Sequence, residues 1–241
     1  DVTTASVALG LATITADDGA VRFAGDVTLT QILAVDTTAG VVDGGDGTFE
    51  VTGTLDATAA ETLTLTLGQG DALFGDGIGG DDVGGTTPLD DVLIVSAANV
   101  TAEGTFDAAS LDVTATGTVQ FAGALTVTDG TTLAIDAGTV DLDGNVNTNG
   151  AAVDLDATTA VDLATGLTLD TTSSTAGGAV AIDVSGTGTV NLVGDVVTTG
   201  AASASDGVAA GAGGAVAITT ANGAINVAGI DTRGGAHTGS L

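Results

Sequence analysis

The sequence lacks cysteine, methionine, tryptophan, tyrosine and lysine, and it has one proline and five phenylalanines in 241 residues. Without cysteine there is no disulfide framework and no thiol nucleophile. With His237 as the single histidine, most catalytic constellations and a zinc site are excluded, so we expect no enzyme. The shortage of aromatic residues predicts a thin core, finely layered from Ala, Val, Leu and Ile.

Positive charge is almost absent as well. Only Arg22 and Arg233 oppose 31 acidic residues, and the formal net charge is −29. Such a surface repels nucleic acid and anionic membranes, so neither is an expected partner. No apolar run approaches the ~18 residues that a spanning helix needs, so we expect no membrane insertion. The chain begins with Asp1 rather than Met, which indicates a processed or excised segment.

Short segments with period-two alternation are the clearest positive signal. Residues 63–67 (LTLTL) and 180–184 (VAIDV) place aliphatic side chains on one side of a strand. Clusters of Gly, Asp, Asn and Thr separate these segments, and the 39 glycines would interrupt any helix. The sequence therefore predicts an all-β protein.

A longer unit recurs above this alternation. Residues 140–150 (VDLDGNVNTNG) return as residues 190–200 (VNLVGDVVTTG) and, shortened, as residues 225–232 (INVAGIDT). An array of this kind predicts a single-stranded parallel β-helix (β-solenoid) of about ten coils, each with roughly 22 residues. An antiparallel sandwich or Greek-key barrel is the alternative, because its strands alternate too.

The whole chain, 1–241, is expected to form one continuous β-solenoid. Three stretches rich in Gly, Asp, Ala or Ser are predicted to leave it as loops. These predicted loops lie near residues 35–47, 68–91 and 201–214.

The recurring cadence V-[DN]-L-x-G-[DN]-V-x-T-x-G, with GGAVAI at 177–182 and again at 213–218, resembles the β-strand-repeat regions of large bacterial surface proteins. Filamentous-haemagglutinin-like adhesins are the best-known group of that kind. The resemblance covers residues 105–235 well and residues 1–104 more loosely. It implies a right-handed parallel β-helical stalk, extracellular or on the cell surface, displayed or secreted as a fibre. The extreme acidity departs from that pattern.

Residues 68–82 (GQGDALFGDGIGGDD) are similar to the Gly-Asp-rich calcium repeats of secreted RTX proteins. That resemblance implies a Ca²⁺ site, because Asp oxygens and turn carbonyls are the ligands that Ca²⁺ prefers. The candidate ligands are Asp71, Asp76, Asp81 and Asp82. A flexible acidic loop is the alternative, so calcium is the one cofactor considered and none is required. Residues 75–80 also match G-x-G-x-x-G, but acids rather than a helix follow, so no dinucleotide site is expected.

Two aspartate pairs, Asp141/Asp143 and Asp154/Asp156, would each project from one side of a strand. Parallel β-helices do carry polysaccharide lyases and hydrolases that use paired carboxylates. Such enzymes also need aromatic platforms or basic residues, and this chain has few of either. We therefore do not expect these pairs to be catalytic.

Two hypotheses about function remain. The first is a structural protein, a segment or subunit of a cell-surface filament or adhesin stalk, whose partners are identical subunits end to end or further repeats of the same chain. The second is a calcium-stabilised adhesin module that binds a glycan or surface through loops 35–47 and 68–91. Calcium dependence of stability would separate the two.

Overall fold

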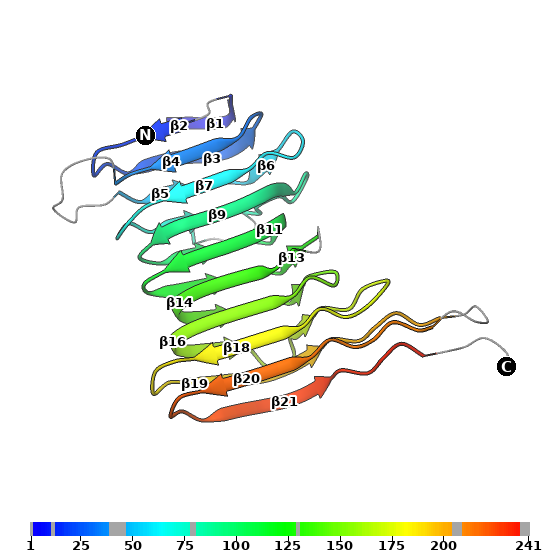
Figure 1. Cartoon of the computed structure of the whole chain (residues 1–241). Coiled ribbons are helices and arrows are strands. Elements are labelled where there is room, and N and C mark those ends of the chain that lie inside the picture. Colours follow the sequence, from blue (N-terminus) through cyan, green and yellow to red (C-terminus); the bar gives the residue numbers. More distant parts are fainter. Residues whose placement is uncertain are drawn as a thin grey trace.

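The computed structural model describes residues 2–10, 13–38, 47–77, 81–128, 131–203 and 209–236. These residues form 21 strands and no helix, which confirms the predicted all-β class. In particular, these ranges contain no helix of the length and apolarity that crossing a membrane requires. The strands follow one another down an elongated stack, from the N-terminal β1 at one end to β21 at the other (Figure 1).

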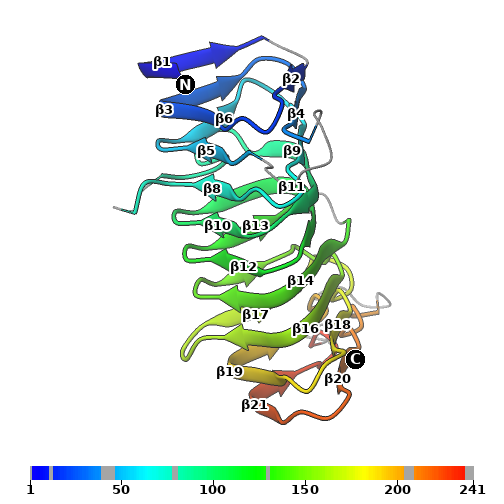
Figure 2. The ribbon, with the colours of Figure 1, turned by 90° about the vertical axis from the view of Figure 1, so that its left-hand side faces the viewer.

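Parallel pairing organises the strands into three rows that run along this stack. Every pairing between two strands in the described ranges is parallel. Most strands pair with strands on both sides along the stack, whereas β1 and β2 at one end and β20 and β21 at the other pair on one side only (Figure 2).

The strands fall into four groups by row. Four strands belong to row 1 only, namely β5 (Phe49–Val51), β8 (Ala72–Phe74), β10 (Val100–Ala102) and β12 (Thr118–Phe121). Four strands belong to row 2 only, namely β6 (Leu55–Ala57), β13 (Leu125–Val127), β15 (Val146–Asn147) and β17 (Thr168–Asp170). Row 3 contains β2 (Thr13–Thr15), β4 (Leu33–Asp36), β7 (Leu63–Thr66), β9 (Leu89–Ala97), β18 (Val180–Val184) and β20 (Val216–Thr220). Seven longer strands each run from one row into another. They are β1 (Val2–Leu9), β3 (Val21–Leu29), β11 (Phe106–Ala115), β14 (Leu133–Leu142), β16 (Val153–Leu163), β19 (Thr189–Val197) and β21 (Ile225–Asp231).

The prediction of a single-stranded β-helix is wrong, because the strands that run from one row into another close a ring. β11, β13, β15, β17, β19, β16 and β14 pair in that order, and β14 pairs back to β11. Seven parallel strands thus close into a barrel-like ring, and the remaining strands lie outside it. The alternation in the sequence predicts a separate strand for each short segment, whereas β14 continues through Ala137-Gly138-Thr139 with only a register shift. The predicted number of coils and the predicted handedness belonged to the β-helix and are withdrawn with it.

The predicted loops are described only in part. Residues 39–46 of loop 35–47, 78–80 of loop 68–91 and 204–208 of loop 201–214 lie outside the described residues. Within 68–91 the chain forms β8 and begins β9, so this stretch is not one continuous loop. Its alternating Ala72-Leu73-Phe74 core segment was hidden by the surrounding Gly and Asp residues.

Alternate side chains in the strands point inward and form a hydrophobic core. Leu63 and Leu65 of β7 are fully buried, whereas Thr64 between them and Thr66 after them are only half-buried. All five phenylalanines are buried in one continuous stack, whose ring centroids lie 6.2, 5.8, 5.7 and 5.4 Å apart from Phe23 through Phe49, Phe74 and Phe106 to Phe121. The few aromatic residues are therefore gathered into one stack within the hydrophobic core.

The threonine in the V-x-T-x-G part of the repeat has a structural reason. Thr148, Thr171 and Thr198 are fully buried where row 2 ends. Their hydroxyls donate 2.7 Å hydrogen bonds to the carbonyls of Ala151, Gly178 and Gly214, respectively. The described residues contain no buried side-chain polar atom without a partner. In these three successive layers one internal hydroxyl thus satisfies a backbone carbonyl at a corner.

The recurring glycine is explained by close approach of successive layers. A Cβ on Gly144 would lie 1.8 Å from the carbonyl oxygen of Gly123, and a Cβ on Gly123 would lie 2.1 Å from that of Gly104. No side chain fits at such distances, so the repeat requires glycine wherever these corners stack.

Candidate functional site

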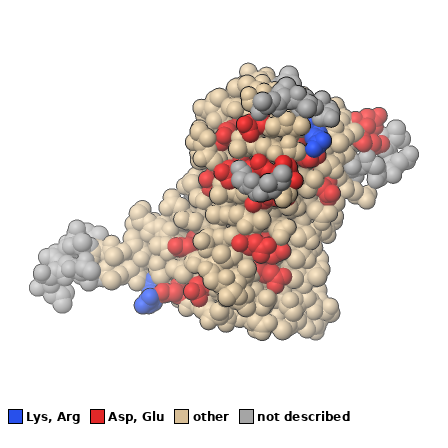
Figure 3. Space-filling view, turned by 180° about the vertical axis from the view of Figure 1, so that it is seen from behind, with Lys and Arg blue, Asp and Glu red and all other residues tan. Residues whose placement is uncertain are grey.

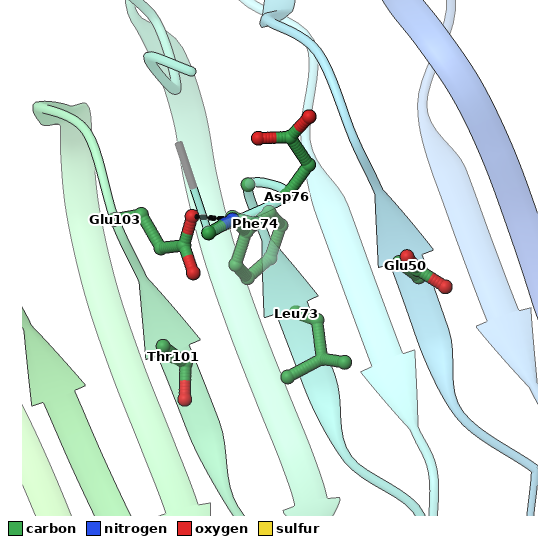
Figure 4. A pocket seen from close by; sticks show the side chains of 8 residues that line it. Glu50, Leu73, Phe74, Asp76, Thr101 and Glu103 are labelled. Carbon is green, nitrogen blue, oxygen red and sulfur yellow. Dashed lines mark hydrogen bonds between the residues drawn. The ribbon is translucent and has the colours of Figure 1, made fainter. Parts of the chain in front are cut away.

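Three carboxylates from neighbouring layers meet beside the end of row 1. Asp76 follows β8, and Glu103 follows β10. Asp81, a few residues after Asp76, lies beside both of them. One oxygen from each of Asp76, Asp81 and Glu103 lies within 4.8 Å of the others. We call these three residues the acidic group. Figure 4 shows Glu103 next to the turn that carries Asp76.

Backbone amides hold the acidic group in place. The Gly77 N–H donates to Oε2 of Glu103, and the Asp76 N–H donates to Oδ2 of Asp81 at 3.2 Å. Gly77 has a φ of 86°, in the left-handed region that glycine adopts readily. This turn is what points its amide at Glu103.

The acidic group is a partly desolvated cluster of like charges. Burial raises the pKa of the Asp81 carboxyl, and the negative charges of Asp76 and Glu103 raise this pKa further. A pocket of about 250 Å³ adjoins the group and is lined by Asp76, Glu103, Glu50 and Thr101, among others. Converging carboxylate oxygens of this kind are able to hold a hard divalent cation such as Ca²⁺.

The structure brings together only two of the four predicted calcium ligands. Asp71 lies elsewhere, and its Oδ1 accepts hydrogen bonds from the backbone N–H and the Nδ2 of Asn99 at 3.1 and 2.9 Å. The Oδ1 of Asp82 accepts from the Thr105 N–H at 2.8 Å. Asp71 and Asp82 therefore connect one layer to the next instead of joining Asp76 and Asp81.

Glu103 is the ligand candidate that the sequence analysis missed. It lies far from 68–82 along the chain, but Phe74 pairs with Ala102 in the parallel register of β8 and β10. The residues that follow, Gly75 and Glu103, are consequently neighbours. Aligning the two strand ends would have identified Glu103, but the register was not readable from sequence.

Many other acids and amides connect layers in the same way as Asp71 and Asp82. The backbone N–H of a threonine in the following layer is hydrogen-bonded to a side-chain oxygen of Asp26, Asp56, Asn99 or Asn145 at 3.1, 2.8, 2.9 and 2.9 Å, respectively. Short Asp and Asn side chains suit this task because they reach adjacent backbone amides. The bias toward Asp thus has a structural cause that is independent of any metal.

The two aspartate pairs considered for catalysis lie on outward positions. Burial raises the pKa of Asp141, and the charges of Asp143 and Asp162 raise it further. Gln120 donates to Asp143 at 3.0 Å and, more weakly, to Asp141 at 3.5 Å. Asp141 and Asp162 are register partners, so this outward row continues from layer to layer.

The second pair belongs to a similar row of acids. Asp156 pairs in register with Asp136 above and Asp183 below, beside a surface depression of about 230 Å³. Burial raises the pKa of Asp156, and Asp154, Asp183 and Asp136 raise it further. Figure 3 shows acidic side chains gathered in several separate groups on one face of the molecule.

Neither arginine is available to these acids as a free cation. Arg22 pairs with Glu50 through its Nε at 2.9 Å, and Arg233 pairs with Asp231 at 2.6 Å. His237 lies outside the described residues. The arrangement of carboxylates is thus suited to binding a cation or facing water.

Comparison of the chain with protein-family models, with curated proteins and with solved structures gave no match.

Proposed function

We propose that this chain is a structural protein, a segment or subunit of an extracellular or cell-surface fibre or adhesin stalk. The observation that supports this most is the continuous stack of parallel strands (Figure 2), whose buried hydrophobic residues form one cluster along it. Backbone hydrogen bonds between layers run along the long axis in three rows, so pulling on the stack loads all three rows together. Such a body works through its length and stiffness.

The surface chemistry supports the same proposal. The net charge of −29 keeps the stack soluble and discourages nonspecific side-by-side aggregation. The acids are used repeatedly as connections between layers, and the acidic groups described above contain no lysine and no free arginine. We accordingly propose no enzymatic activity.

The location is tested by labelling whole cells that make the protein. Gold-conjugated antibody against the purified chain is applied to intact and to permeabilised cells, followed by electron microscopy. We expect label on intact cells, on projections or fibres outside the envelope. Label confined to the interior of permeabilised cells would refute the proposed surface role.

The acidic group favours a second candidate, an adhesin module stabilised by calcium that binds a glycan or surface through its loops. We expect calorimetric titration with CaCl₂ to show one binding step, which the double variant Asp76→Asn/Glu103→Gln abolishes. Asp112→Asn, an exposed aspartate on β11 away from the group, is the control and should titrate like the unmodified protein. Identical isotherms for the double variant and the unmodified protein would refute the calcium site.

A further inference from the structure

The C-terminal layer leaves inward-facing aliphatic side chains uncovered. Ile225 and Ile230 of β21 are 45% and 49% exposed, although their register partners in β19, Val190 and Val196, are fully buried. Among the described strands, β21 pairs only with β19, and β20 pairs only with β18. The last described layer, which holds β20 and β21 (Figure 1), therefore leaves apolar side chains exposed and has strand edges with no partner among the described strands.

The N-terminal layer presents the opposite edge of the same rows. In the described ranges β1 pairs only with β3, and β2 only with β4. Val7 of β1 and Ile14 of β2 face the core but are only partly covered. Both ends of the stack thus expose strand edges that point in the same chain direction.

Successive register pairs place these two ends in equivalent positions. Following the partners layer by layer in row 2 leads from Val7 to Ile230 without a break. The same procedure in row 3 leads from Ile14 to Ile218. A second copy placed below the first would continue both aliphatic columns with side chains of similar size.

The strands at both ends carry little charge, although the whole chain is strongly acidic. β1, β2 and β20 contain no charged residue. β21 contains only Asp231, whose charge is paired with Arg233. Exposed edge strands usually carry charges, proline or bulges that prevent strand addition. The strands at these two ends carry no proline and almost no charge, so like-charge repulsion between these strands themselves is weak.

From these observations we infer that copies of this chain stack head to tail, and this inference rests on the proposed structural function. β21 and β20 of one copy pair in parallel with β1 and β2 of the next. The two surfaces are different, so the contact does not close on itself after two copies, and repetition gives a filament. Parallel pairing requires this orientation, because a twofold contact between like ends would set the strands antiparallel.

The test uses one charged substitution at each end. Val7→Asp blocks the N-terminal end, Ile230→Asp blocks the C-terminal end, and Ile225→Asp is a second variant of the C-terminal end. Val95→Asp is the matched control, because Val95 is 45% exposed on β9 in the middle of the stack. Circular dichroism checks that each variant keeps its strands, and analytical ultracentrifugation over a range of concentrations measures association.

We expect the unmodified chain and Val95→Asp to form species that lengthen with concentration. Each end variant should associate at least about tenfold more weakly, because an unpaired carboxylate would be buried in the contact. An equimolar mixture of Val7→Asp and Ile230→Asp should form a one-to-one dimer through the two intact ends and stop there. No other mode of association makes that combination of results.

Several results would overturn the inference. These are an unmodified chain that stays monomeric at every concentration, end variants that associate like the control, or a mixture that forms no heterodimer. A monomer in solution combined with antibody label on intact cells would leave the proposed surface role standing while removing the stacking. Label inside cells only would remove the surface role even if the purified chain polymerises.

Discussion

Replacing Thr171 with valine tests whether the repeated buried threonine stabilises the fold through its hydroxyl. Thr171 is fully buried, and its hydroxyl donates to the Gly178 carbonyl at 2.7 Å. Valine has nearly the same shape, so packing changes little while the carbonyl loses its partner. Leaving a buried backbone acceptor unsatisfied costs about 1–3 kcal/mol, and we expect the free energy of unfolding to fall by that amount.

Urea unfolding followed by circular dichroism measures this loss, with the slope of the transition checked for constancy. Thr126→Val is the control, because Thr126 on β13 is an outward, half-buried residue, and the change should alter stability by less than ~0.5 kcal/mol. Thr148→Val and Thr198→Val should resemble Thr171→Val, since their hydroxyls make equivalent bonds. If Thr171→Val unfolds at the same urea concentration as the unmodified chain, the hydroxyl does not have the structural role assigned to it.

Two further predictions concern the glycine corners and the acidic rows. Gly144→Ala should destabilise strongly, by more than ~2 kcal/mol in urea unfolding, because its Cβ would meet the Gly123 carbonyl, while Gly19→Ala, where the nearest atom lies 3.7 Å away, should have little effect. Asp156 has a raised folded-state pKa, so its contribution to stability is fully present below the unfolded-state pKa of about 3.9 and is lost as the pH rises through the folded-state value. The melting temperature should therefore rise as the pH is lowered from 7 toward the unfolded-state value, and Asp156→Asn should show a smaller rise. An equal rise in that variant would show that Asp156 is not responsible.

Local features of the sequence were sufficient to predict the all-β class and the parallel arrangement, although β8 was hidden within a predicted loop. Residues 63–67 alternate because a strand with one buried side must alternate, and this holds whatever the strand pairs with. The recurrence of residues 140–150 at 190–200 correctly indicated that equivalent segments stack on one another, since Val140, Val161 and Val190 are successive register partners.

Contacts between distant residues decided the rest. The acidic group depends on the β8–β10 register, which places Glu103 beside Asp76, and no pattern within 68–82 contains that information. The continuity of β14 across Gly138 depends on neighbouring layers holding both halves in place, so the closed ring of seven strands was invisible in a chain that reads as short segments. The exposed ends likewise exist only in three dimensions: Ile230 has the same local pattern as Val196, and it is uncovered solely because no described strand lies below it. Periodicity encodes which side of a strand is buried, whereas register and end position arise from pairing across the stack, and these are what the candidate site and the proposed filament contact depend on.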